Sequence, residues 1–146
     1  MEISEVRVRL VGNKDDRLRA FCSITIDHEF VVRDIKVIEG GGGYFVAMPS
    51  RKMSDHCEKC GAKNHLRAKF CNDCGAELAQ NRGKKDIKGR PKLHADIAHP
   101  INSKCRQTIQ GKVIAAFKRE LEISKQPGYK PTALDPPEED VPQIIS

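Results

Sequence analysis

Four cysteines in two closely spaced pairs constrain the fold of this chain more than any other feature. Cys57 and Cys60 form the first pair, Cys71 and Cys74 form the second, and a glycine follows each pair. Two residues between cysteines allow a tight backbone knuckle whose amides point at the sulfur atoms, and glycine permits the left-handed conformation that this turn often requires. Two knuckles placed face to face present four thiolates as a tetrahedron, the closed geometry of a structural Zn²⁺ site. The spacing therefore predicts a zinc ribbon.

Other uses of these thiols fit less well. A catalytic zinc usually keeps one position open, and a redox Cys-x-x-Cys pair is expected in a βαβ context that is not evident here. Iron bound by four thiolates stays open, because spacing does not distinguish it from zinc. His56 and His65 flank the knuckles, and with four cysteines available we expect them to be exposed and not to bind the metal. Cys22 and Cys105 stand apart, and we interpret both as buried structural thiols.

The segment before the cysteines has the alternation of a β-sheet. Val6, Val8 and Leu10 alternate with arginines, and a second alternation runs over residues 18–26. The third run, FVVRDIKVIE, changes phase near Asp34, which indicates a β-bulge, and YFVAMP is a fourth short run. Short connections between these runs predict a four-stranded antiparallel meander.

The segment after the cysteines predicts one helix, which begins at Asn102 or Ser103 as its N-cap. Its apolar stripe is expected to pack against the sheet and consists of Ile109, Val113, Ala116, Phe117 and Leu121. The predicted fold class is therefore α+β: a four-stranded antiparallel sheet with a C-terminal helix, interrupted by a small zinc-ribbon insertion. We expect one domain from residues 1–52 and 94–123, the ribbon at 53–79, a basic linker at 80–93, and a disordered, proline-rich acidic tail at 124–146.

Positive charge is concentrated around the cysteines. Residues 51–93 hold twelve Lys and Arg against five Asp and Glu, whereas residues 1–50 hold seven against eight. Most charged runs are solvated surfaces, but a local excess of this size is also typical of chains that bind nucleic-acid phosphates.

The outer segments resemble the SpoVG family of stage V sporulation, or septation, proteins. The resemblance rests on FVVRDIKVIEG, FVAMPSRK and DIAHPIN, within residues 1–52 and 94–119. It implies a homodimeric bacterial regulator, linked to septation, cell division or sporulation, that binds DNA and RNA. Its nucleic-acid contacts would map here to Arg51, Lys52, Lys104 and Arg106. The family's short connection between MPSRK and DIAHPIN is replaced in this chain by the whole four-cysteine segment.

Two functions follow. In the first, the ribbon extends a basic surface that binds DNA or RNA phosphates. In the second, the ribbon docks a protein partner and the chain is an adaptor in cell division. The candidate nucleic-acid-binding residues are Arg51, Lys52, Lys59, Lys63, Arg67, Lys69, Lys84, Lys85, Lys104 and Arg106, with Lys88, Arg90 and Lys92 as further basic candidates. Aromatic groups nearby are Tyr44, Phe45 and Phe70, which we expect to be core residues, Phe70 filling space against a knuckle.

An enzyme is not expected. Asp27, His28 and Glu29 form an acidic and basic cluster, as do Asp96 and His99, but turn and cap chemistry explains them. No run approaches the roughly 20 apolar residues of a membrane span, and the charged first strand is unlike a signal peptide. A cytoplasmic protein is therefore expected, in which paired thiols indicate a metal before a disulfide.

Overall fold

The computed structural model describes residues 1–12, 16–80 and 92–134. The chain forms two compact units: unit 1 contains residues 1–49 and 98–146, and unit 2 contains residues 50–97. The predicted boundaries at residues 52 and 94 lie within a strand pair of unit 2 that is described below. The predicted basic linker lies largely outside the described residues, as do residues 135–146 of the predicted tail.

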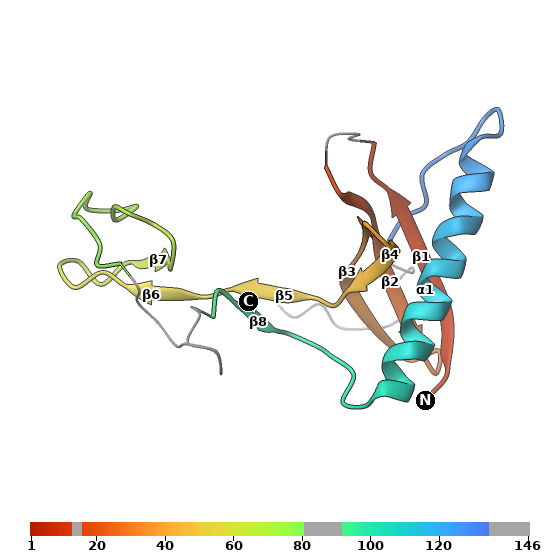
Figure 1. Ribbon diagram of the computed structural model, residues 1–146, viewed down its shortest axis with the longest axis horizontal. Helices are drawn as coiled ribbons and strands as arrows, with labels where there is room; N and C mark the ends of the chain where they lie inside the picture. Colours follow the sequence, from red (N-terminus) through yellow and green to blue (C-terminus); the bar gives the residue numbers. More distant parts are fainter. Residues whose placement is uncertain (13–15, 81–91, 135–146) are drawn as a thin grey trace. The chain divides into compact units, whose positions relative to one another are not determined.

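Unit 1 is an antiparallel meander covered by one helix, as the sequence predicts (Figure 1). Its sheet has the order β1-β2-β3-β4. The strands are β1 (Ile3–Leu10), β2 (Leu18–Ile26), β3 (Phe30–Gly40) and β4 (Gly43–Ala47). The turn between β2 and β3 has Asp27 and His28 at φ of 51° and 59°, and the Oδ1 atom of Asp27 accepts a hydrogen bond from the Glu2 amide at 2.8 Å. Turn chemistry therefore accounts for these two residues.

The predicted bulge in β3 is confirmed. The pairing between β2 and β3 shifts between Cys22, which faces Ile35, and Ile24, which faces Val32. Asp34 lies in this interval with φ of 61°, in the left-handed region that an Asp tolerates better than most residues. The extra residue keeps the apolar side chains on both sides of the shift directed into the core.

The helix α1 (Ser103–Ser124) begins as predicted. The N-cap Asn102 accepts a hydrogen bond from the Cys105 amide at 2.8 Å, which satisfies one of the free amides of the first turn. Ile109, Val113 and Phe117 are buried against the sheet, and the Phe117 ring lies 4.9 Å from that of Tyr44 between centroids. Ala116 and Leu121 are partly buried, so the predicted stripe is the packing face.

Unit 2 consists of short strand pairs. Strand β5 (Ser50–Lys52) pairs with β8 (His94–Asp96), and β6 (Ser54–His56) pairs with β7 (Lys63–His65). A single bridge joins Phe70 and Glu77. The sequence did not reveal the β5–β8 pair, because two three-residue segments so far apart in the chain carry no periodic signal.

Among the described residues, no helix has both the length and the apolar character needed to cross a membrane.

Candidate metal centre

The two cysteine pairs of unit 2 form two knuckles of the same construction. In the first, the Gly61 amide donates to the Cys57 carbonyl at 2.9 Å and the Cys57 amide donates to the Ala62 carbonyl at 2.8 Å. In the second, Gly75 donates to Cys71 at 3.1 Å and Cys71 donates to Ala76 at 2.8 Å. Gly61 and Gly75 have φ of 77° and 75°, so the predicted left-handed glycines are confirmed.

The knuckles bring all four sulfur atoms together. The Sγ atoms of Cys57, Cys60, Cys71 and Cys74 lie within 4.8 Å of one another. Two of the separations are 3.7 Å, between Cys57 and Cys74, and 3.5 Å, between Cys60 and Cys71. A tetrahedral ion with Zn–S bonds of about 2.3 Å separates its ligands by about 3.8 Å. The spacing and the thiol donors therefore fit a tetrahedral thiolate-bound metal ion.

Hydrogen bonds favour the charged form of one of these thiols. The Cys71 sulfur accepts from the amides of Cys74 and Asp73 and from the Asn64 side chain, each at 3.4 Å. The Cys74 amide is the largest contributor, followed by Asn64, and together these donors lower the pKa of the Cys71 thiol to about 6. A thiol with this pKa is largely a thiolate at neutral pH, the form that binds a metal.

The neighbouring thiol of Cys60 shows the opposite effect. Its hydrogen bond from Ala62 lowers its pKa, but the sulfur of Cys71, loss of solvation and the other two sulfurs outweigh this and raise the pKa to about 12. Opposite shifts are typical of like-charged groups that share one site. A divalent cation between them would allow all four sulfur atoms to carry negative charge.

Asn64 is a residue of this site that sequence reasoning missed. It is 4% exposed, its Nδ2 donates to the Ala62 carbonyl at 3.2 Å as well as to Cys71, and its Oδ1 accepts from the Asn72 amide at 2.8 Å. One side chain thus joins the two knuckles and orients the sulfur of Cys71, a candidate metal ligand. No spacing rule indicates it, since its role depends on the folding of β7 against the second knuckle.

The two histidines near the knuckles are outside the sulfur cluster. His56 is exposed, as expected, and its Nδ1 atom lies 2.9 Å from the Gly61 carbonyl oxygen. His65 is half-buried instead, and its Nδ1 atom accepts a hydrogen bond from the Arg67 amide at 3.1 Å. His65 is the last residue of β7 and stands beside Leu66, which is buried.

The remaining thiols belong to unit 1. Cys22 is fully buried in β2, and this burial raises its pKa to about 12. Cys105 is half-buried in the first turn of α1 and packs at the margin of the core. Cys22 is buried, as expected, whereas Cys105 is only partly buried.

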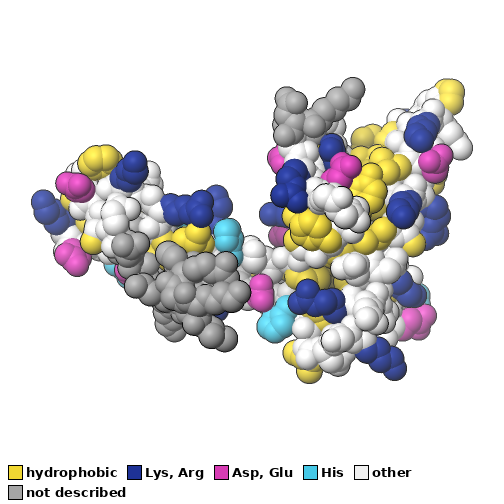
Figure 2. Space-filling view, viewed as in Figure 1, with side chains coloured by type: hydrophobic (Ala, Val, Ile, Leu, Met, Phe, Trp, Pro, Cys, Tyr) yellow, Lys and Arg dark blue, Asp and Glu magenta, His cyan; other side chains and the backbone are white. Residues whose placement is uncertain are grey.

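The described basic candidates are all exposed and divide between the units (Figure 2). Lys104 and Arg106 lie in the first turn of α1, in unit 1. Six lie in unit 2: Arg51, Lys52, Lys59, Lys63, Arg67 and Lys69. Lys92 is also an exposed residue of unit 2, whereas Lys84, Lys85, Lys88 and Arg90 lie outside the described residues.

The aromatic candidates differ from the prediction in two of three cases. Tyr44 packs in the core of unit 1, as expected. Phe45 is 42% exposed and Phe70 is 61% exposed, so the expectation that both are core residues is wrong. Strand alternation places Phe45 on the face opposite to Tyr44, and Phe70 precedes a buried cysteine of the second knuckle.

The sequence matches the SpoVG family over residues 1–119. A relative from Agathobacter rectalis, named as septation protein SpoVG, is 38% identical over 122 residues, which cover 84% of this chain and 98% of the relative. A relative of the same name from Shouchella clausii is 38% identical over 130 residues, which cover 89% of this chain and 95% of the relative. A third relative of this name, from Bacillus cytotoxicus, is 40% identical over 125 residues, which cover 86% of this chain and 91% of the relative.

Proposed function

Because the chain belongs to the SpoVG family, we propose that it is a bacterial regulatory protein that binds DNA or RNA, with a structural zinc ribbon that extends its basic binding surface. The name of its relatives, septation protein SpoVG, supports a role in septation or cell division. The resemblance of the family to stage V sporulation proteins supports control of sporulation as a related role. The proposal includes a cytoplasmic location, a homodimer and no catalytic role.

The proposed metal is zinc, bound by Cys57, Cys60, Cys71 and Cys74. Support comes from the tetrahedral fit of the sulfur separations and from the thiolate-favouring hydrogen bonds at Cys71. When bound, such an ion supplies folding energy and no open coordination position. The chain's own residues would then hold the ribbon rigid, so that basic side chains on the knuckles and on β7 have fixed positions.

The observation that carries the proposal is the exposure of the basic side chains of unit 2. Arg51 and Lys52 on β5 are exposed, and so are Lys59, Lys63 and Lys69 around the knuckles. Exposed Lys and Arg side chains bind phosphates and release condensed counterions, which gives affinity without reading bases. The exposed ring of Phe70 adds a surface on which an unpaired base could stack.

A protein-interaction adaptor is the second candidate. It is favoured by the same exposed Phe70, because aromatic side chains are enriched at protein interfaces. Under this reading the ribbon binds a partner in cell division, and the partner is retained after nuclease treatment.

The test is a fluorescence-anisotropy titration with short DNA and RNA, single-stranded and duplex, at several salt concentrations. The native protein is compared with a variant in which Lys59, Lys63, Arg67 and Lys69 are all Gln, and with a control variant carrying Lys118→Gln and Arg119→Gln on α1. Loss of four phosphate contacts should flatten the slope of log affinity against log salt by about 3 to 4, since each contact contributes about 0.7–0.9. The control should keep the native slope.

Equal slopes for the native and ribbon variants would exclude unit 2 from the nucleic-acid surface and favour the adaptor. Absence of binding by every form would overturn the regulator reading. Metal analysis of the same preparations should give one zinc per chain, and sedimentation should give the mass of a dimer.

A further inference from the structure

The sheet of unit 1 has one face against α1 and one face opposite to it, which we call the open face. Strand alternation places on the open face the residues that lie between core positions. In β2, for example, Phe21 lies between Ala20 and Cys22, which are both buried in the core under α1. The side chains of the open face include Glu5, Arg7, Arg9, Phe21, Ser23, Thr25, Lys36, Ile38 and Phe45.

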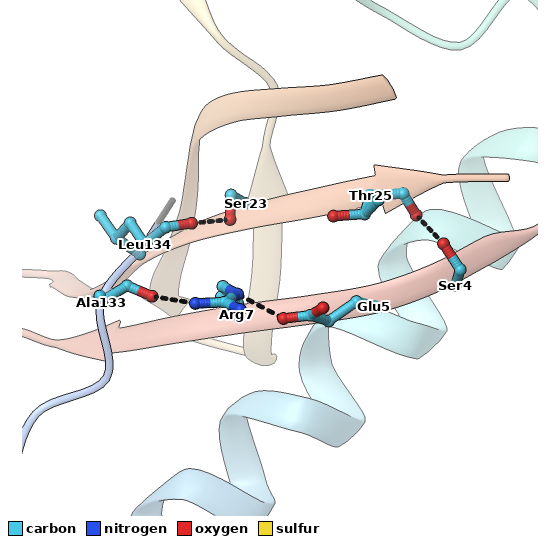
Figure 3. Close-up of polar contacts among 7 residues, drawn as sticks. All are labelled: Ser4, Glu5, Arg7, Ser23, Thr25, Ala133 and Leu134. Carbon is cyan, nitrogen blue, oxygen red and sulfur yellow. Dashed lines mark hydrogen bonds and ion pairs between the residues drawn. The ribbon is translucent and has the colours of Figure 1, made fainter. Parts of the chain in front are cut away.

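The segment after α1 covers one row of this face. Arg7 on β1 faces Ser23 on β2. The Ala133 carbonyl accepts a hydrogen bond from Arg7 Nη1 at 3.3 Å, and the Leu134 carbonyl accepts one from the Ser23 hydroxyl (Figure 3). The described chain therefore ends over this row.

The neighbouring row holds an aromatic ring between two cations. Phe21 on β2 faces Arg9 on β1 and Lys36 on β3. Phe21 is half-buried, whereas Arg9 and Lys36 are exposed. Side chains directly opposite each other on one face have Cβ atoms about 5 Å apart. A base stacked on Phe21 would thus have a cation within reach of its phosphates on each side.

A second ring, that of Phe45 on β4, is held in place by its neighbours. A Cβ atom at Gly40 would lie 3.3 Å from Phe45 Cε1 and 3.4 Å from Arg17 Nη2. Because Gly40 has no side chain, the ring and the guanidinium can both approach this point of the β3–β4 hairpin. Arg17 is fixed in turn, since its Nε donates to the Glu39 carbonyl at 3.0 Å. The ring is therefore positioned, yet 42% of the residue remains exposed.

The two rings are separate positions on the open face. Phe21 faces Lys36, and Phe45 faces Ile38, which is two residues further along β3. Two strand spacings, about 10 Å, and two residues, about 7 Å, separate the backbone positions of the two phenylalanines. The rings are thus too far apart to stack on each other, and each can take a different base.

The charge of the open face favours a polyanion. Among its side chains named above, the cations are Arg7, Arg9 and Lys36 and the acid is Glu5, which is paired with Arg7. Aromatic rings in a positively charged surface stack with bases of any sequence, provided that the bases are unpaired. The combination therefore fits a single strand better than a duplex.

We propose that the open face is a second nucleic-acid site, which binds single-stranded RNA by stacking bases on Phe21 and Phe45 and by binding phosphates with Arg9 and Lys36. RNA fits because its loops and single strands present unpaired bases, which aromatic side chains on a four-stranded sheet can stack. The site lies within unit 1 and does not need the ribbon. It rests on the proposed function for the class of partner and differs in its residues and in its requirement for unpaired bases.

The first test measures the affinity of the full chain for a short labelled RNA without self-complementarity, by fluorescence anisotropy. Phe45→Ala should weaken binding about 5- to 100-fold, the usual effect of losing one stacked base. Phe45→Trp should keep the affinity, because an indole ring also stacks. Affinity for a duplex of the same sequence should not change in either variant.

Phe30→Ala is the matched control. Phe30 is 64% exposed at the start of β3, but it faces Ile26, which packs against the core on the α1 side. Its loss should leave RNA affinity unchanged. Equal affinities of the native chain and Phe45→Ala, or equal losses in Phe45→Ala and Phe30→Ala, would overturn the proposal.

The second test leaves both rings in place. A variant with Arg9→Gln and Lys36→Gln should flatten the slope of log affinity against log salt by about 1.4, since each phosphate contact with a single strand contributes about 0.7. The variant with Lys118→Gln and Arg119→Gln on α1 should keep the native slope. An unchanged slope in the first of these variants would overturn the proposal.

The variant with four Gln residues on the ribbon separates this site from the proposed function. If that variant has a flatter slope while Phe45→Ala binds RNA as the native chain does, the proposed function stands and the open-face site is refuted. If Phe45→Ala loses affinity while the ribbon variant keeps its slope, the open-face site stands and the ribbon is excluded. Absence of binding by the native chain would refute both.

Two further readouts identify the occupant. Single-stranded DNA of the same sequence is the second probe, and a loss of affinity in Phe45→Ala for DNA but not for RNA would overturn the assignment to RNA. Sedimentation measures the mass of each variant. A native dimer that dissociates in Phe45→Ala, with unchanged RNA affinity, would assign the open face to a second copy of the chain and overturn the proposal.

Discussion

Unit 1 and unit 2 differ most in what lies at their centres. In unit 1, side chains from four strands and one helix form an apolar core that includes Ile24, Ile35, Val37, Val113 and Phe117. The corresponding cluster in unit 2 contains Leu78 and two of the cysteines, Cys57 and Cys71, with three alanines around it. The larger unit thus has an apolar core, whereas the smaller one has, where a core would be, thiols that could hold a metal ion.

This difference shows how a small unit can be inserted into a domain built on a β-sheet. A segment as short as residues 50–97 buries too little apolar surface for independent stability, and metals commonly supply the missing energy. Insertion costs unit 1 little, because loop-closure entropy rises only slowly with loop length. We therefore expect the two units to respond to different substitutions, and four predictions test this, from the largest expected effect to the smallest.

Removal of one ligand should unfold unit 2 and leave unit 1 folded. Cys71→Ser deletes the sulfur that receives three hydrogen bonds, and metal binding in comparable modules is worth about 10–16 kcal/mol. Metal analysis and amide NMR of unit 2 give the readout, with Cys105→Ser as the control. A Cys71→Ser protein that keeps a full metal equivalent and a dispersed unit 2 spectrum would show that the cluster does not stabilise this unit.

Truncation of a core side chain of unit 1 should destabilise unit 1 and leave unit 2 unchanged. Phe117 is 1% exposed and contacts Tyr44, so Phe117→Ala should lower the free energy of unfolding of unit 1 by about 3–5 kcal/mol. Metal content should not change. Phe45→Ala, at a side chain of β4 that is 42% exposed, is the matched control and should lower the free energy of unfolding much less. Urea denaturation followed by circular dichroism measures both, and equal losses would refute the assignment of Phe117 to the core.

Removal of the buried Asn64 side chain should weaken metal binding more than it destabilises the fold. Asn64→Ala removes two donated hydrogen bonds and one accepted from Asn72, and loss of such an outer contact typically weakens metal binding about 10- to 100-fold. Competition with a chelating dye measures the affinity. Asn72→Ala keeps the backbone amide that Asn64 uses and should bind as the native chain does. An unchanged affinity for Asn64→Ala would restrict this residue to a packing role.

Replacement of glycine by alanine should stabilise unit 1 at one position and destabilise unit 2 at another. Gly111 lies within α1, and a Cβ there would meet no atom within 4 Å, so Gly111→Ala should stabilise unit 1 by about 0.5–1 kcal/mol. Gly61 has φ of 77°, and Gly61→Ala should destabilise the first knuckle by about 1–2 kcal/mol. Thermal unfolding reports the first change and metal release the second. The same sign for both would contradict the backbone argument.

Features that depend on neighbouring residues in the chain were predictable from the sequence. Strand alternation identified the meander, the phase change at Asp34 identified the bulge, and the helical stripe identified the packing face of α1. The knuckles were predictable for the same reason, because a Cys-x-x-Cys-Gly segment closes its own hydrogen bonds within a few residues. Each of these signals is a period or a spacing, so it can be read without knowledge of the rest of the fold.

Tertiary structure alone decided the features that join distant segments. The pairing of β5 with β8, the three hydrogen bonds of Asn64 and the contact of Leu134 with Ser23 each bring together groups that have no common pattern in the sequence. The exposure of Phe45 and Phe70 was decided in the same way, since it depends on which face the packing leaves uncovered. The sequence by itself determined the local elements and the four thiols that could hold a metal ion. The folded chain determined their surroundings, because those contacts depend on chain direction and register over long separations.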